Sequence, residues 1–369
     1  MTLTVGLTYN QKKEVSPEEN VPEDFYAEFD SAETINALKS AIESAGHKVV
    51  LIEADENAFT KLKRLKSQLD IVFNIAEGMR GESRESHMPS ILEMLGIPYS
   101  GSGPLTLAIC LDKARTKEIL SFHRIKTPEF QIFTDSSEEL NQKLKFPLIV
   151  KPISEGSSKG IKDDCVVRTD EELRNKISSL LKTYNQPALV EEFLEGREFT
   201  VAVMGNTDPV VLPIVEIIFD ELPDNANKIY SYEAKWIWDV PSKPLNIFSC
   251  PADLPKPLYT QICRTAIAAY KAVNCKDLCR IDIRLKGTTP CIIEMNPLPG
   301  MIPNPEDNSC FPKAARAAGI QYNDLINMIL YYAAERQGME NKVNSPQEIQ
   351  ELVTTLVNAS KKTKGHVLA

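Results

Sequence analysis

The sequence has little of what would mark a nucleic-acid-binding, membrane or secreted protein. Its 369 residues carry a formal net charge of -9 rather than the excess of Lys and Arg that binding to a phosphate backbone requires, so we expect no nucleic-acid partner. No stretch approaches the roughly 20 apolar residues of a membrane span. The first residues, MTLTVGLTYNQKK, lack the basic start and apolar run of a secretory signal. We therefore expect a cytoplasmic protein that makes no membrane contact.

Cysteines are scattered rather than clustered. Cys275 and Cys279 are the only close pair among the eight, and no second pair or neighbouring His completes a set of metal ligands. This spacing favours free, buried thiols over a cysteine metal site. Internal repeats and low-complexity tracts are missing too, and the 43% hydrophobic and 25% charged residues are ordinary for a globular chain.

The chain is long enough for two or three domains of roughly 100–200 residues each. Short apolar runs predict strands, and apolar residues at helical spacing predict helices. In the first hundred residues these patterns predict strands at 3–8, 48–53 and 70–74 and helices at 31–45 and 88–95. The order strand, helix, strand is typical of a β-α-β unit, so we expect an α/β sheet at the start of the chain.

A Gly- and Ser-rich segment at 100–104 marks a boundary, and one helix through 107–120 is expected after it. Later patterns predict strands at 127–133, 147–150 and 188–193 and helices at 171–182, 257–273 and 323–336. We expect four parts, namely an N-terminal α/β domain, a central lobe, a C-terminal lobe and a helical surface tail, at residues 1–102, 103–190, 191–340 and 341–369.

Two segments carry polar residues two positions apart, Arg280 with Asp282 and Glu294 with Asn296. In a strand, residues at this spacing point to the same face of the sheet. Asp282, Glu294 and Asn296 offer the oxygen ligands that Mg²⁺ takes when it also holds phosphates, and Arg280 would add a cation beside them. The same pattern also fits the solvent-facing side of two amphipathic strands, and spacing alone leaves both interpretations open.

The segment KPISEGSSKG at 151–160 is a strand end followed by a loop of small residues. Such loops leave backbone N–H groups free to approach phosphate oxygens. It lacks the GKS or GKT ending of a Walker loop, so generic P-loop chemistry does not apply. Taken alone, the segment is more typical of an ordinary surface turn, and Lys113 and Lys151 in isolation are typical of surface lysines.

The order of the motifs carries a resemblance. LDKARTK at 111–117, KPISEGSSKG, EEFLEGREF at 191–199, YSYEAKW at 230–236 and the RID and EMNPLPGM segments occur in one order, with fitting intervals, over about residues 70–335. In this the chain resembles the D-alanine-D-alanine ligase family of ATP-grasp enzymes. The resemblance implies an α/β ATP-grasp fold, in which an N-terminal Rossmann-like domain precedes two α+β lobes that enclose ATP. It also implies a homodimer.

The resemblance further implies a role for each matching residue. Lys113 and Lys151 would contact the ATP phosphates, and a loop with Ser157 and Ser158 would cover them. The hinge at the adenine would consist of Glu191, Glu192, Phe193 and Leu194. Glu198 would bind the ribose, and Lys235, on a mobile loop, would reach the γ-phosphate. Mg²⁺ (or Mn²⁺) would be held by Asp282, Glu294 and Asn296. Arg280 would stabilise the transferred phosphoryl group, and the Gly300 N–H would donate to the oxyanion.

The substrate side departs from the family pattern. The family's first loop, HGGxSxE, is replaced here by a sequence with no Gly pair, in which Glu14 is a candidate stand-in for the family's carboxylate. An acidic insertion, SPEENVPEDFYAEFD at 16–30, follows and is expected to be a solvated surface loop. Glu77 replaces a His, Trp236 replaces a Tyr and cannot accept a hydrogen bond, and Ser309 aligns with the Ser that binds the second substrate's carboxylate.

The resemblance implies an ADP-forming ligase that joins two small amino acids through an acylphosphate, with the cell-wall precursor D-alanyl-D-alanine as its default product. Because the first-substrate pocket departs from the family, a peptide or natural-product ligase with a different donor is an alternative. A third hypothesis is an ATP-binding regulator that has lost catalysis. The completeness of the predicted ATP and metal residues argues against it.

Overall fold

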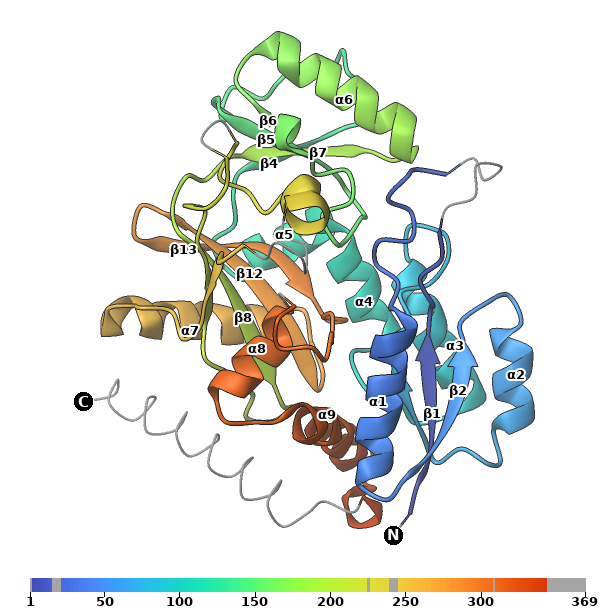
Figure 1. Cartoon of the computed structure of the whole chain (residues 1–369). Helices are drawn as coiled ribbons and strands as arrows, with labels where there is room; N and C mark the ends of the chain where they lie inside the picture. Colours follow the sequence, from blue (N-terminus) through green and yellow to red (C-terminus); the bar gives the residue numbers. More distant parts are fainter. Residues whose placement is uncertain (1, 15–20, 224–225, 239–244, 308, 344–369) are drawn as a thin grey trace.

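The computed structural model describes residues 2–14, 21–223, 226–238, 245–307 and 309–343. In these ranges the chain forms three β-sheets with helices packed against them (Figure 1). The expected α/β character is present. None of the described helices is both long and apolar enough to cross a membrane. All eight cysteines are free thiols, as their spacing predicts.

The N-terminal sheet is parallel, with strand order β2-β1-β3. Its strands and helices are β1 (Thr4–Tyr9), α1 (Ala32–Ser44), β2 (Lys48–Glu53), α2 (Ala58–Leu65), β3 (Ile71–Asn74) and α3 (His87–Leu95). Helix α1 begins at Ser31, whose Oγ accepts a hydrogen bond from the Thr34 N–H and satisfies one of the free helix-start donors. Gly96, with φ 65°, ends α3 as a left-handed cap. The sequence did not predict α2.

The single helix predicted at 107–120 is wrong. The structure has two helices, α4 (Pro104–Leu111) and α5 (Lys113–Phe122), separated by Asp112, whose backbone is extended. The Asp112 carboxylate accepts hydrogen bonds from the N–H groups of Ala114 and Arg115, both at 2.9 Å, and so caps α5. This break places Lys113 at the first position of α5.

The central sheet is antiparallel, with strand order β4-β7-β5-β6. Its strands are β4 (Phe130–Phe133), β5 (Leu148–Pro152), β6 (Val166–Val167) and β7 (Ala188–Glu192), and helix α6 (Asp170–Tyr184) covers one face (Figure 1). Leu173, Ile177 and Leu180 of α6 pack into a core that belongs to this sheet alone.

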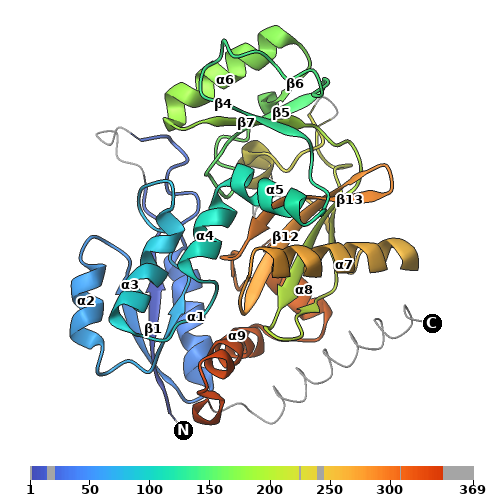
Figure 2. The ribbon, with the colours of Figure 1, turned by 180° about the vertical axis from the view of Figure 1, so that it is seen from behind.

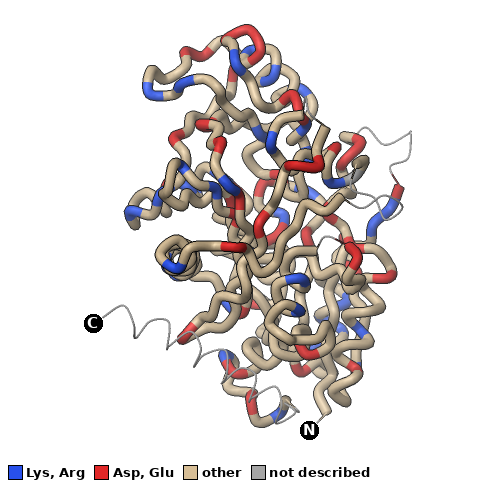
Figure 3. The backbone as a smooth tube through the Cα atoms, turned by 60° about the vertical axis from the view of Figure 1, so that its left-hand side comes forward, with Lys and Arg blue, Asp and Glu red and all other residues tan. Residues whose placement is uncertain are grey.

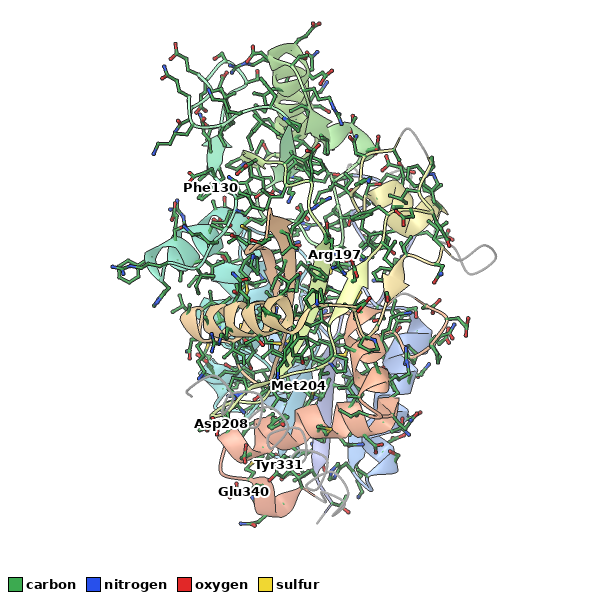
Figure 4. The ribbon with its side chains drawn as sticks, turned by 90° about the vertical axis from the view of Figure 1, so that its left-hand side faces the viewer. Phe130, Arg197, Met204, Asp208, Tyr331 and Glu340 are labelled. Carbon is green, nitrogen blue, oxygen red and sulfur yellow. The ribbon has the colours of Figure 1, made fainter. Side chains whose placement is uncertain are left out.

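The third sheet has strand order β11-β10-β8-β12-β13, with β9 paired to β8, and all its pairs are antiparallel. Its strands are β8 (Glu198–Met204), β9 (Val210–Val211), β10 (Val215–Ile217), β11 (Phe248–Ser249), β12 (Leu278–Lys286) and β13 (Thr289–Asn296). Figure 4 labels Arg197, which directly precedes β8, and Met204, which is its last residue.

Helices cover both faces of this sheet. Helix α7 (Lys256–Ala272) lies on one face (Figure 2), where Val201 and Val203 of β8 contribute to its core. Helices α8 (Cys310–Ala317) and α9 (Tyr322–Arg336) lie against the other face, where Ala202 and Met204 contribute. The alternation along β8 follows from the two-residue period of a strand. The sequence predicted α7 and α9 but not α8.

The N-terminal sheet shares its core with this second face. Residues of β1, α1, α8 and α9 form one continuous hydrophobic cluster, and the Asn327 side chain of α9 donates a 2.8 Å hydrogen bond to the Ala41 carbonyl of α1. Short helical turns complete the described chain at Arg84–Ser86, Asp163–Cys165, Ala234–Trp238 and Glu340–Lys342. The predicted tail at 341–369 lies almost wholly outside the described residues, and the predicted domain boundaries stay predictions.

Candidate active site

A cleft with a cavity volume of about 260 Å³ lies where the three sheets meet. Acidic and basic positions are interleaved around this middle part of the molecule (Figure 3). The predicted site residues that line the cleft are Glu77, Lys113, Lys151, Ser157, Ser158, Glu198, Lys235, Arg280, Asp282, Glu294, Asn296, Gly300 and Ser309. The fold thus brings most of the predicted set to one cavity.

Strands β12 and β13 put the predicted metal-binding residues side by side. Arg280 pairs in register with Asn296, and Asp282 with Glu294. The Arg280 guanidinium donates to both Asp282 oxygens at 3.1 and 3.0 Å, and the Asn296 amide donates to Asp282 Oδ2 at 3.0 Å. The shared face that the two-residue spacing predicts is therefore present, and it faces the cleft rather than open solvent.

The residues present fit a magnesium ion that also holds phosphate. Among the described residues no three His, Cys, Asp or Glu side chains form a metal-binding group. Asp282 and Glu294 supply two carboxylates, and Asn296 supplies an amide oxygen. This set is too small for an all-protein cage but suits Mg²⁺, which usually keeps waters and takes the rest of its ligands from substrate phosphates.

The two predicted phosphate lysines are held by carboxylates. Lys113 forms an ion pair with Glu294 at 2.8 Å. Lys151 and Lys117 both pair with Glu191, which is only 1% exposed. Although burial opposes its ionisation, the two ammonium groups lower the pKa of Glu191 to about 2. The sequence did not single out Lys117, since nothing in the spacing indicates that this lysine is buried.

The predicted adenine hinge does not turn its side chains into the cleft. Glu191 points to the lysines, Glu192 pairs with Lys286 at 2.7 Å, Leu194 is buried, and none of these or Phe193 is among the described residues that line the cavity. Contacts from this segment to a ligand would therefore have to come from its backbone.

Arg284 is a cleft residue that the sequence analysis missed. It continues the two-residue period of Arg280 and Asp282, which was the available signal. Its guanidinium forms an ion pair with Glu198 at 3.2 Å and lies over the ring of Phe193, 4.9 Å from the centroid. Burial raises the pKa of Glu198, with Arg284 opposing the shift.

The loop after β5 has a special backbone. Ser157 and Ser158 have φ 48° and 60°, in the left-handed region that non-glycine residues rarely adopt. The Gly156 N–H donates to the Glu28 carboxylate at 2.6 Å, and the Ser158 hydroxyl donates to the Tyr230 carbonyl at 3.0 Å. Contacts from other parts of the chain thus hold this loop in its strained shape.

The acceptor end of the cleft contains Gly300 and Ser309. The Ser309 hydroxyl donates to the Gly300 carbonyl at 3.0 Å and accepts from the Ile302 N–H at 3.2 Å. Lys235 lines the cleft, and burial together with the Arg280 guanidinium lowers its pKa to about 8. The predicted Trp236 side chain lies outside the described part of the structure.

The insertion at 16–30 is not wholly the solvated loop that the sequence suggested. In its described part, Glu28 and Asp30 line the cleft, and the Glu28 side chain is only 3% exposed because it pairs with Arg84 and Lys159. Glu14, the candidate named from the sequence, is exposed and is not a lining residue. Sequence alone could not distinguish buried from exposed acids in so polar a segment.

Comparison with known proteins agrees with this geometry. The family model described as "D-ala D-ala ligase C-terminus" matches residues 118–331. The uncharacterized protein y4sG of Sinorhizobium fredii is 35% identical over 82% of this chain and 87% of its own length. The D-alanine-D-alanine ligase of Desulforudis audaxviator is 33% identical over 81% and 92%. A crystal structure of D-alanine-D-alanine ligase from Bacillus anthracis complexed with ATP has 26% identity, a TM-score of 0.68, and coverage of 92% of this chain and 100% of that one.

Proposed function

This chain belongs to the D-alanine-D-alanine ligase family, and on that premise we propose that its cleft joins the carboxylate of one small amino acid to the amine of another. It is an ATP-dependent ligase that forms C–N bonds, and its fold is the ATP-grasp fold that the resemblance implied. The family supports a homodimer and a cytoplasmic location, and light scattering of the purified protein tests the first of these.

The observation that carries the proposal is the joint placement of Arg280, Asp282, Glu294 and Asn296 with Lys113 along one cleft. Phosphoryl transfer asks for positioning and charge neutralisation more than for covalent chemistry by the protein. Arg280 and Lys113 supply the cations that neutralise phosphate charge, and the carboxylates of Asp282 and Glu294 hold them in position.

The proposed reaction has two steps. A carboxylate oxygen of the first amino acid attacks the γ-phosphorus of ATP, the bond to the bridging oxygen breaks, and ADP leaves with an acylphosphate formed. The amine of the second amino acid then attacks the acyl carbon, a C–N bond forms, phosphate leaves with the C–O electrons, and the amine loses a proton.

Each residue has a defined part in these steps. Lys113 and Lys151 bind phosphate oxygens, while Arg280 neutralises charge on the transferred group. Lys235 reaches the γ-phosphate, and the Gly300 N–H donates to the oxyanion of the tetrahedral intermediate. Bound Mg²⁺ or Mn²⁺ on Asp282, Glu294 and Asn296 supplies further charge neutralisation at the phosphates.

Other predicted residues position the substrates. Ser157 and Ser158 lie in the loop over the phosphates, Glu198 binds the ribose, and Ser309 binds the second amino acid's carboxylate. The segment of Glu191, Glu192, Phe193 and Leu194 borders the adenine through its backbone.

A phosphate-release assay tests the proposal. Purified protein is mixed with ATP, Mg²⁺ and pairs of D- and L-amino acids, and the product is weighed by mass spectrometry. We expect ADP and phosphate in equal amounts and a product one water lighter than the two amino acids together. Release of no phosphate with any pair would overturn the proposal and leave an ATP-binding regulator as the alternative.

A further inference from the structure

The part of the cleft around Glu77 holds more carboxyl groups than one ammonium group can pair with. Glu28, Asp30, Glu77 and Glu85 all line it. Glu28 is already neutralised, because Arg84 donates to it at 2.9 Å and Lys159 lies 3.1 Å away. Among the residues that the structure describes, the other three carboxylates have no such partner.

Glu85 is the most telling of the three. It is 9% exposed, lines the cavity, and makes no side-chain hydrogen bond or ion pair with any described residue. Its neighbour in the chain, Arg84, is committed elsewhere, to Glu28, to Glu155 and to the Ser154 carbonyl. A buried carboxylate facing a cavity without a partner is costly to the fold, and such a group is typical of a ligand site.

Asp30 and Glu77 are half-buried and also face the cavity. Neither side chain has a hydrogen bond or an ion pair among the described residues, and both line the same cavity as Glu85. The three acids come from different parts of the chain, namely the end of the insertion, the segment after β3 and the turn at Arg84–Ser86. Their convergence is therefore a product of the fold rather than of one acidic stretch.

The electrostatics agree with an unneutralised cluster. Burial, followed by the charges of Glu85, Glu28 and Asp30, raises the pKa of Glu77 well above its usual value. Burial raises the pKa of Asp30 to about 7, and burial, partly opposed by Arg84, raises that of Glu85 to about 8. The groups disfavour one another's charge, and a cation among them would relieve that cost.

We propose that this end of the cleft takes a first amino acid that carries a second cationic group, a diamino acid, and that Asp30, Glu77 and Glu85 bind its two ammonium groups. The inference rests on the proposed ligase function, since it names the donor of that reaction. A neutral side chain would leave at least one of the three carboxylates in the cleft without a partner. Phe73 and Ile75 also line the cavity, and these apolar side chains suit the carbon chain of a diamino acid.

A donor panel tests the specificity. Phosphate release is measured with D- and L-alanine and with both forms of 2,3-diaminopropionate, 2,4-diaminobutyrate, ornithine and lysine, at saturating ATP. We expect kcat/KM for the best diamino acid to exceed that for alanine of the same configuration by about 30-fold or more, the effect of one well-paired buried charge. Turnover of alanine that equals or exceeds that of every diamino acid would overturn the inference while leaving the ligase function intact. If none of the amino acids in the panel supports phosphate release, the ligase function itself is overturned.

Two amide variants, Glu77→Gln and Glu85→Gln, test the residues. Each removes one charge with almost no change of shape, so the KM for the diamino acid should rise about 30-fold or more, while the KM for ATP stays unchanged. A purely structural role would weaken all donors equally, so the preference for diamino acids over alanine should fall only if the carboxylates bind the second ammonium.

The matched control is Glu82→Gln. Glu82 precedes Glu85 in the same loop but is exposed and does not line the cleft, and its substitution should leave the preference unchanged. A thermal unfolding measurement accompanies each variant. If Glu77→Gln and Glu85→Gln both fold and both prefer diamino acids over alanine as strongly as the wild-type protein does, the assignment of these carboxylates is wrong.

Discussion

At the scale of single residues, the cleft is assembled from charged side chains that hold one another in place. Lys113 pairs with Glu294, and Arg280 with Asp282. These pairs fix the cations before any phosphate arrives, so little reorganisation is needed when charge develops during phosphoryl transfer.

Arg280→Lys tests the importance of this geometry. Arginine reaches both oxygens of Asp282 with a planar fork, whereas lysine offers one point charge on a flexible stem. We expect kcat in the phosphate-release assay to fall by about 100-fold or more, because a fixed donor at the transferred group is lost. Circular dichroism should show an unchanged fold. A kcat equal to that of the unchanged chain would contradict the role given to Arg280.

The sequence predicted those site residues that lie at the two-residue spacing of a strand. It missed those whose role depends on whether the side chain is buried in the cleft or exposed to solvent. Asp282 and Asn296 were found because two-residue spacing puts them on one face. Glu28 and Asp30 were missed because a polar insertion looks alike whether its acids face water or a cavity. Whether an acid faces a paired lysine or a ligand depends on neighbours far away in the sequence.

At the scale of elements, the break at Asp112 decides where Lys113 lies. Apolar residues continue at helical spacing through the break, and so the sequence predicted one helix. The Asp112 side chain accepts hydrogen bonds from the first N–H groups of α5, which starts a new helix there. The spacing of apolar residues gives no sign of such a cap. The strands were predicted more closely, and β2 has the bounds expected from the apolar run.

Asp112→Ala should remove the cap of α5. Two backbone donors lose their acceptor, so we expect the free energy of unfolding to drop by about 1 kcal/mol, measured by urea denaturation. The KM for ATP should rise as well, because Lys113 follows the cap directly. Asp112→Asn keeps an acceptor oxygen and serves as the control. An unchanged urea midpoint in Asp112→Ala would show that the cap contributes nothing.

At the scale of the whole molecule, stability should be greatest at about pH 5. The pKa of Glu28 and of Glu191 is about 2 in the fold against a usual 4.5, so their stabilising contribution is complete above pH 4.5 and is lost as the pH falls toward 2. The pKa values of Asp30 and Glu85 are about 7 and 8, so the fold binds protons that the unfolded chain does not. Stability therefore rises as the pH falls from about 8 to about 5.

Urea unfolding between pH 3 and pH 9 measures this curve. In Glu85→Gln the decline on the alkaline side should be shallower, since one buried charge no longer has to form. A free energy of unfolding that is constant from pH 5 to pH 8 in the wild-type protein would contradict the raised pKa values of Asp30 and Glu85.

The contacts between the insertion and the loop after β5 also limit how the chain can be divided into exchangeable modules. Asp24 accepts hydrogen bonds from the Gly160 N–H and the Tyr184 hydroxyl, and Glu28 accepts from the Gly156 N–H. A central sheet moved by itself into a relative would leave both glycine amides without their acceptors. Working chimaeras should therefore inherit residues 21–30 and 154–160 from the same parent, although the two segments lie more than a hundred positions apart in the sequence.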